Sequence, residues 1–275
     1  MEEKIKMDKV MTTSEPTAER IRKYLEEGKR FDSRGLLDFR EITIEKNVSK
    51  KAEGSVRVRI GKTEVIVGVK LDVSAPYPDS PNKGNLMVTA EMLPLSSPRF
   101  ELGPPKFEAI ELGRVTDRGL RESGFIDLEK LCIKEGEKVW TVFVDVYSIN
   151  DDGNLIDAAA IGSVAALKIA KMPKYDEGSE KVLHEEYENK GLPLTNLIPV
   201  ATSVYKIGKS LIVDPTREEE DLSECRVTMT NSDGVISSLQ KSLSSALEVE
   251  EAKRIFEISE EVSKKVLKEI EKNIK

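Results

Sequence analysis

Three arginines in one short stretch of the sequence have the residue type and the spacing needed to bind an anion. Arg114, Arg118 and Arg121 stand at positions i, i+4 and i+7 of the run E-L-G-R-V-T-D-R-G-L-R. In a helix this spacing places all three guanidinium groups on one face. Each guanidinium can take two oxygens of a phosphate, so the arginine row predicts a polyanion site. The alternative is a set of surface or subunit-interface salt bridges.

The charge around the arginine row bounds what it can bind. Asp117 and Glu122 fall off the stripe, so the three like charges would repel one another without an anion between them. The formal net charge of the chain is −7, whereas a protein that binds nucleic acid with its whole surface is usually basic. Any polyanion site is therefore expected to be local, or shared with a partner chain.

The remaining composition excludes several classes of protein. The single histidine, His184, lies in a polar run, which argues against a His-rich metal site and a Ser-His-Asp hydrolase. Cys132 and Cys225 stand far apart in apolar runs, so we expect two buried free thiols rather than a disulfide or a metal site. We expect no metal and no cofactor. Without a signal core or an apolar run of membrane-spanning length, the sequence predicts a cytoplasmic protein with no membrane contact.

Periodicity predicts an α/β protein whose elements would present the arginine row on a helix. Helices are expected over residues 12–28, 107–122 and 155–170, and a hairpin of half-buried strands over 56–69. A run of β-branched and aromatic residues over 139–149 predicts a central strand. The turn over residues 150–154 is expected to cap the helix that follows it.

The second half is expected to repeat part of the first. An I-G-K-[ST] turn joins two strand-like runs at residues 60–63 and again at 207–210. Residues 225–231 and 235–240 predict a further hairpin, and residues 172–193, being polar, predict a linker. The chain is expected to end in an amphipathic helix whose apolar stripe includes Phe256.

The order of motifs over residues 30–265 resembles the RNase PH family of phosphate-dependent 3′→5′ exoribonucleases. Four motifs carry the resemblance: a charged loop, the arginine helix, a turn into an alanine-rich helix and an acidic segment. In this sequence they read, in that order, Arg30-x-Asp32-x-Arg34 with Arg40; Glu111 to Arg121; N-D-D-G-N from Asn150; and I-V-D-P-T-R-E-E-E-D from Ile212.

The resemblance implies a fold and a division of the chain. The fold is an α/β RNase PH-like (ribosomal protein S5 domain 2-like) one, with duplicated β-α-β halves, mixed sheets and flanking helices. The implied parts are an N-terminal helical extension at 1–29, a first half at 30–195, and a second half with a C-terminal helix at 196–275. The extension, the proline-containing loop at 74–105 and the overall length are most similar to the non-catalytic ring subunit of the archaeal exosome.

The sequence departs from active family members at the phosphate site. Where those members hold the attacking phosphate with a glycine- and serine-rich turn, this chain has Asn154, Leu155 and Ile156. An arginine of the active members corresponds to Glu108, whose carboxylate would repel phosphate. Asp214 keeps the position of a catalytic aspartate. The phosphorolytic site is therefore expected to be degenerate.

The family counterpart of a second catalytic aspartate is Glu220, although the run of acidic residues leaves the register open. The main alternative to a degenerate site is thus an active 3′→5′ exoribonuclease or tRNA-trimming phosphorylase that uses Asp214 and Glu220. Another is an RNA-binding module without a ring. For Asp214 itself, a role as a turn residue before Pro215 stays open.

The resemblance implies a structural and RNA-clamping subunit of a hetero-hexameric ring, a trimer of dimers. Its partners would be a catalytic RNase PH-like subunit, RNA-binding cap subunits and single-stranded RNA. Arg114, Arg118 and Arg121 would bind RNA phosphates near the partner's active site. The four charged residues of the loop after residue 29 are instead expected to lock that loop by salt bridges: Arg30, Asp32, Arg34 and Arg40.

Overall fold

The computed structural model describes residues 13–274, and its first half is built on a mixed six-stranded sheet. Its strands lie in the order β1-β2-β3-β6-β4, and the short strand β5 pairs with the beginning of β6. The β4–β6 pair is parallel and the other pairs are antiparallel. The bounds are β1 Ile42–Lys46, β2 Gly54–Ile60, β3 Thr63–Ser74, β4 Asn85–Met92, β5 Cys132–Lys134 and β6 Lys138–Asn150.

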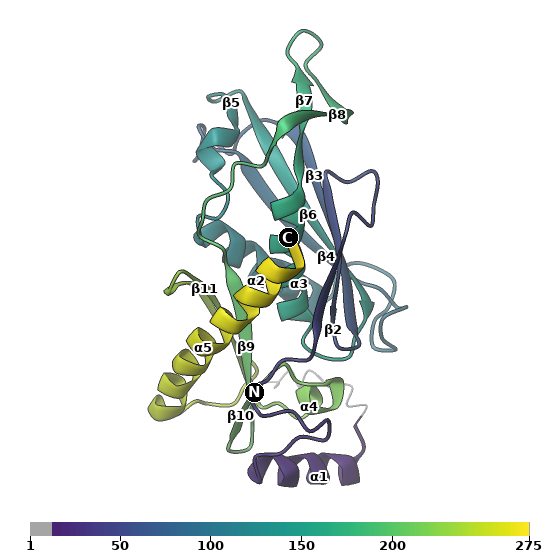
Figure 1. Ribbon diagram of the computed structural model, residues 1–275, viewed down its shortest axis with the longest axis vertical. Helices are drawn as coiled ribbons and strands as arrows, with labels where there is room; N and C mark the ends of the chain where they lie inside the picture. Colours follow the sequence, from purple (N-terminus) through teal and green to yellow (C-terminus); the bar gives the residue numbers. More distant parts are fainter. Residues whose placement is uncertain (1–12, 275) are drawn as a thin grey trace, which may run out of the picture.

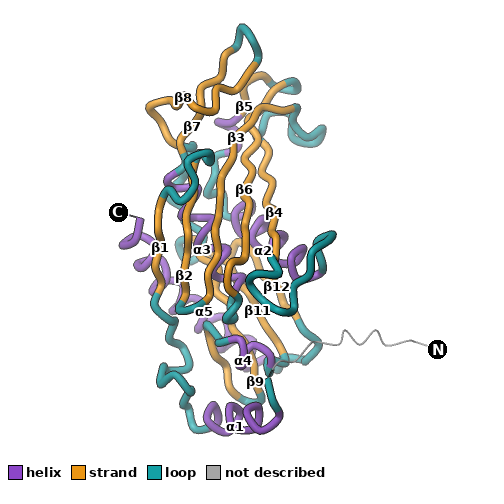
Figure 2. Tube along the Cα trace, turned by 90° about the vertical axis from the view of Figure 1, so that its right-hand side faces the viewer, coloured by secondary structure: helices purple, strands orange, loops and turns teal. Residues whose placement is uncertain are grey.

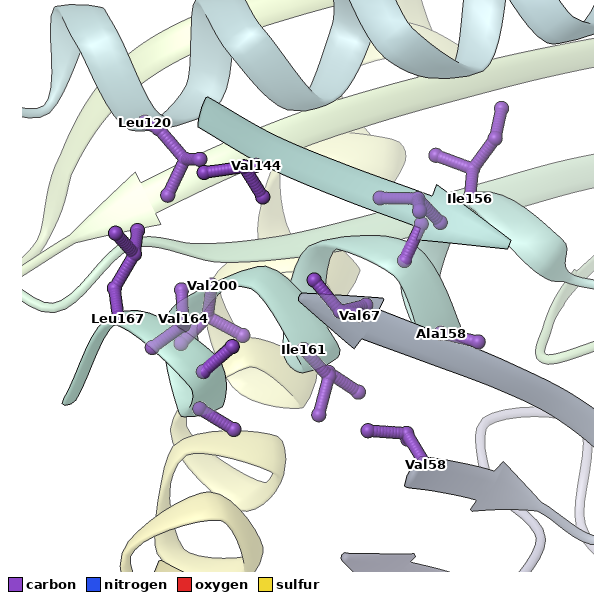
Figure 3. Packing of buried hydrophobic residues seen from close by; sticks show 14 of the residues in the cluster. Val58, Val67, Leu120, Val144, Ile156, Ala158, Ile161, Val164, Leu167 and Val200 are labelled. Carbon is purple, nitrogen blue, oxygen red and sulfur yellow. The ribbon is translucent and has the colours of Figure 1, made fainter. Parts of the chain in front are cut away.

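Two helices cover one face of this sheet, while the other face stays open (Figure 2). α2 (Phe107–Glu122) packs on β4, and α3 (Leu155–Ile169) packs on β2 and β3. Alternating valines of the hairpin, such as Val58 and Val67, meet Ile161 and Val164 of α3 in the core (Figure 3). α3 is buried on nearly all sides. Its small alanine and glycine residues allow the close packing of this helix against its neighbours that the sequence predicted.

The second half forms a four-stranded antiparallel sheet in the order β10-β9-β11-β12. The long helix α5 packs on β9 and β11, and α1 packs on the β9–β10 hairpin (Figure 1). Gly61 and Gly208 take φ angles of 57° and 59° in the two I-G-K-[ST] turns, so both predicted hairpins form with the same turn. The bounds are α1 Glu15–Glu26, β9 Val200–Ile207, β10 Ser210–Val213, α4 Arg217–Asp221, β11 Cys225–Ser232, β12 Val235–Ser242 and α5 Val249–Ile274.

Residues 172–193 are not a linker, so that prediction is wrong. They form a separate two-stranded hairpin, β7 (Lys171–Asp176) and β8 (Lys181–Gly191), which projects from one end of the molecule (Figure 1). No further layer of the described chain packs on this hairpin, so its strands need few apolar residues. Its largely polar sequence therefore gives no signal of a strand. Tyr175 anchors it, since its ring lies 6.2 Å from that of Trp140.

Two predictions about apolar residues also differ from the structure. The sequence predicts Phe256 in the apolar stripe of the C-terminal helix, but this residue is exposed, because the buried face of α5 passes through Ile255, Ile258 and Val262. Cys225 is buried as expected, whereas Cys132 is only partly buried; both are free thiols. Within residues 13–274, none of the helices combines the length and the apolar character that a membrane span requires.

The tight contact between α3 and the sheet gives a first testable expectation. A Cβ added to Gly162 would lie 2.6 Å from Cγ2 of Val67, so Gly162→Ala overpacks the core. Overpacking costs about 1–3 kcal/mol and helix propensity returns about 1, so we expect a net loss of roughly 1 kcal/mol. Urea unfolding measures it. The control is Gly113→Ala in α2, whose new Cβ has only ordinary contacts; equal stability of the two variants would contradict the expectation.

Candidate functional site

The arginine row lies on α2, and two of its three members are exposed. α2 buries Leu112, Val115 and Gly119 toward the core, which leaves Arg114 and Arg118 on the outer face. Among the side chains that the structure describes, no carboxylate lies at salt-bridge distance from either of these two guanidinium groups. Arg118 Nη1 donates a long hydrogen bond of 3.4 Å to the amide oxygen of Gln240. Both arginines therefore keep their charge available to an anion from outside the chain.

Arg121 has a different environment from the rest of the row. Its guanidinium donates to both carboxylate oxygens of Asp117, at 3.2 and 2.7 Å, and to the carbonyl oxygen of Leu86 at 2.7 Å. The hydrogen bond that Arg121 donates to the Asp117 carboxylate raises the pKa of Arg121. The expectation that Asp117 lies away from the stripe is thus wrong, because a side chain at i−4 reaches the last arginine. Arg121 ties α2 to β4.

A second carboxylate of α2, that of Glu111, is neutralised by an arginine of the second sheet. Glu111, one turn before Arg114, pairs with Arg226 of β11 at 2.7 Å and also accepts a hydrogen bond from Ser242 of β12. The side chains of Glu111 and Arg226 are only 12% and 11% exposed. Glu108 lies exposed in the first turn of α2, where a negative charge suits the positive end of the helix dipole.

The charged loop and the acidic segment lock together around Asp214. This carboxylate is fully buried and accepts hydrogen bonds from Arg34 Nη1 at 2.9 Å and from Arg40 Nη2 at 2.7 Å. It also accepts one from the backbone N–H of Arg40 and one from the amide of Asn154. Arg30, fully buried, pairs with Glu219, and Asp32 pairs with Arg34 at 2.7 Å. The prediction that this loop is locked by salt bridges is confirmed.

The surroundings of Asp214 decide what it can do. Each of its oxygens already accepts hydrogen bonds from arginine or amide donors. To protonate a leaving group or ligate a metal, the carboxylate would first have to break two buried ion pairs. It is more than a turn residue before Pro215, because it joins segments that lie far apart in the sequence. The side chains that the structure describes include no group of three His, Cys, Asp or Glu residues arranged to hold a metal ion.

The turn before α3 is filled by the chain's own groups. Asn154 is fully buried with φ of 63° and is the N-cap residue of α3, as the turn predicted; its side chain makes no capping hydrogen bond, and its amide donates to Asp214 instead. Its backbone N–H donates at 2.8 Å to the carboxylate of Glu220. A carboxylate of the chain therefore occupies one backbone N–H of the turn that leads into α3. Leu155 and Ile156, the next two residues, are buried.

An ion network that the sequence did not reveal closes the same region. Arg217 of α4 pairs with Asp151 at 3.3 Å and with Asp221 at 3.0 Å, and Asp221 also pairs with Arg99. Burial raises the pKa of Asp151. These residues come from three separate segments, so no local spacing signals their contact. Together with Asp214, they form a set of largely buried ion pairs between the turn before α3 and the segment around α4.

Asp157, in the first turn of α3, is a buried carboxyl group beside this network. Ser203 donates to it from its backbone N–H at 3.1 Å and from its hydroxyl at 2.7 Å. Burial raises the pKa of Asp157 to about 7, although the hydrogen bonds of Ser203 lower it. The folded chain therefore keeps this proton at pH values where the unfolded chain, with the ordinary pKa of 3.8, has lost it.

The pH dependence of Asp157 can be measured. Its contribution to stability is complete below pH 4 and is lost as the pH rises through about 7. We expect Asp157→Asn to remove this loss, because an amide can donate to the Ser203 hydroxyl while that hydroxyl donates to Thr228. Across this range the variant should gain on the order of a few kcal/mol relative to wild type. Parallel stability curves would contradict this; exposed Asp233→Asn is the control.

The comparisons with known proteins identify the class. Domain 1 of the 3′ exoribonuclease family, RNase PH, matches residues 38–173, and domain 2 of the same family matches residues 198–262. The chain belongs to the RNase PH family. The resemblance drawn from its motifs and the expected α/β fold class are confirmed.

Individual relatives narrow the comparison. The chain is 46% identical over 254 residues to exosome complex component Rrp42 of Thermococcus onnurineus, which covers 90% of this chain and 92% of the relative. It is 48% identical over 215 residues to Rrp42 of Methanopyrus kandleri, covering 78% and 80%. Among solved structures, the Archaeoglobus fulgidus exosome with RNA bound to the active site aligns at 39% identity and a TM-score of 0.83, over 91% of this chain and 96% of the other.

Proposed function

We propose that this chain is a non-catalytic subunit of an archaeal exosome ring, working in the cytoplasm. In this function it pairs with a catalytic RNase PH-like homologue in a hetero-hexameric ring, shapes that partner's active site and helps to hold single-stranded RNA. Its relatives named Rrp42 are described as exosome components, and a similar solved chain belongs to an exosome with RNA at its active site. RNA-binding cap subunits would complete the assembly.

The proposal that the chain is non-catalytic rests on one observation: the chain's own side chains occupy the region of Asp214 and the turn before α3. Asp214 is held by Arg34 and Arg40, and Glu220 accepts the hydrogen bond of the Asn154 backbone N–H before α3. Phosphorolysis needs bound phosphate in line with the RNA 3′ end. Because Asp214 already neutralises Arg34 and Arg40, a phosphate entering this site would have to displace that carboxylate to bind either arginine.

The RNA-binding half rests on the arginine row. Arg114 and Arg118 stand exposed on one face of α2 without a carboxylate partner in the described chain. They would neutralise RNA phosphates next to the partner's active site. Arg121 belongs to the same face, but its guanidinium is held by Asp117 and Leu86. It would therefore contribute mainly by fixing the C-terminal end of the helix.

The proposed division of the chain follows the same family. The extension at 1–29 would precede a first half at 30–195 and a second half at 196–275. The end of the first family match at residue 173 and the start of the second at 198 support a boundary between them. Residues 1–12 of the extension lie outside the described part of the chain.

Mixing tests the ring. The purified chain and the catalytic homologue from the same organism are combined, and the mass of the product and its phosphate-dependent RNA shortening are measured. We expect a trimer of heterodimers that shortens RNA faster than the homologue alone. A mixture that stays as separate proteins would instead favour an RNA-binding module without a ring. Unchanged activity of the homologue on mixing would remove the proposed role in shaping its site.

A further inference from the structure

The β11–β12 hairpin lies against α2 and contacts charged side chains of that helix. Gln240 and Ser242 point to the same side of β12. Gln240 accepts a hydrogen bond from Arg118, and Ser242 donates one to Glu111. Arg226, on the neighbouring strand, adds the ion pair with Glu111. The second sheet therefore touches both a cation and an anion of α2.

The hairpin treats the two charged residues of α2 differently: it neutralises Glu111 but leaves Arg118 charged. Glu111 lies at i−3 from Arg114, a spacing at which a free carboxylate pairs with an arginine on the same helix. Arg226 and Ser242 hold this carboxylate instead, and the side chains of Glu111 and Arg226 are both nearly buried. Arg114 is thereby left without a partner in the described chain.

Arg118, in contrast to Glu111, has an uncharged partner on the hairpin. The oxygen of Gln240 accepts a hydrogen bond from the guanidinium but carries no charge, so it orients Arg118 without neutralising it. A glutamate in the same place would accept the same hydrogen bond and cancel the charge. Gln240 is also the only glutamine of the chain.

We propose that the β11–β12 hairpin positions the arginine row for RNA. Gln240 orients Arg118 while leaving its charge free, and Arg226 with Ser242 withholds Glu111 from Arg114. This inference rests on the proposed function, since the row must bind RNA for its positioning to matter. The three residues act through the arginines, and so they are positioning residues.

Gln240→Glu tests the proposal most simply. Rings assembled with the catalytic homologue are titrated with fluorescein-labelled oligoadenylate at several salt concentrations. Each phosphate of a single strand that a cation neutralises contributes about 0.7 to the slope of log affinity against log salt, so we expect Gln240→Glu to reduce the slope by about 0.7 and to weaken binding. Gln240→Met should keep the slope, because Arg118 retains its charge.

The control for added charge is Asn189→Asp, which makes the same amide-to-carboxylate change at an exposed position of β8. It should leave affinity and slope at the wild-type values. Binding by Gln240→Glu that equals binding by Asn189→Asp would overturn the role of Gln240.

A rescue experiment tests the other partner. Arg226→Met should free Glu111 to pair with Arg114, and so should weaken RNA binding and reduce the salt slope. Arg226→Met combined with Glu111→Gln should restore both, because no carboxylate remains to compete. If the double variant binds RNA as weakly as the single one, the proposed action of Arg226 is wrong. Melting temperatures of both variants separate loss of fold from loss of positioning.

The positioning inference can fail separately from the proposed function. If replacing Arg114 and Arg118 by glutamate leaves RNA binding unchanged, the RNA-binding half of the proposed function fails. If that replacement weakens binding while Gln240→Glu and the rescue pair have no effect, only the role of the hairpin fails.

Discussion

Replacing Arg114 and Arg118 together by glutamate is expected to weaken RNA binding to the assembled ring by about a hundredfold or more. Each charge-assisted hydrogen bond to a phosphate is worth roughly 1.5–3 kcal/mol, and the glutamates add repulsion. The salt dependence should also flatten, by about 0.7 in slope for each RNA phosphate that the ring no longer neutralises. Titration of labelled oligoadenylate at several salt concentrations measures both quantities.

A matched control makes this result specific to the arginine face. Lys264→Glu with Lys265→Glu changes the net charge by the same amount on exposed positions of α5. Those lysines already pair with glutamates one turn away, and RNA binding should stay unchanged. Equal effects of the two double variants would indicate that only overall charge matters. No effect from the arginine variant would return Arg114 and Arg118 to a role in surface salt bridges.

Asp214→Ala is expected to destabilise the fold by about 3–5 kcal/mol, the usual cost of removing one partner from a buried ion pair. The change would leave Arg34 and Arg40, whose side chains are only 12% and 10% exposed, without their shared carboxylate. Alanine also tolerates the φ of 44° at this position less well than aspartate does. Urea unfolding of the purified chain measures the loss.

This outcome separates a structural aspartate from a catalytic one. Removing a catalytic carboxylate often leaves stability unchanged or raises it, because active sites trade stability for function. The control is Asp152→Ala, which removes the weaker and more exposed partner of Arg40 and should cost much less. An Asp214→Ala chain as stable as wild type would contradict the structural role. It would also reopen the alternative of an active enzyme that uses Asp214 and Glu220.

The sequence predicts those structural features that depend on residues close together in the chain. The exposure of Arg114 and Arg118 comes from helical spacing alone, and the bounds of α2 match the predicted 107–122. The hydrophobic alternation of β2 and β3 likewise predicts their hairpin. The β7–β8 hairpin escaped because both of its faces are largely polar, which removes the alternation that marks a half-buried strand.

The part of the site that could not be predicted depends on distant contacts. Asp214 lies 174 residues from Arg40 and 180 from Arg34, and Asn154 reaches it across 60 positions. Spacing along the sequence does not record such contacts, so the charged loop and the acidic segment could be predicted only as separate motifs. The pairing of Glu111 with Arg226 is hidden in the same way, since its partners come from different halves of the fold.

Phosphate-dependent shortening of RNA by this chain alone tests most directly whether the chain is non-catalytic. Purified chain, labelled single-stranded RNA and inorganic phosphate are incubated, and the release of nucleoside diphosphates is measured, with the ring containing the catalytic homologue as the positive control. We predict no release by the chain alone and robust release by the ring. Robust phosphate-dependent release by the chain alone, free of the homologue, would show that the chain is itself an active phosphorylase.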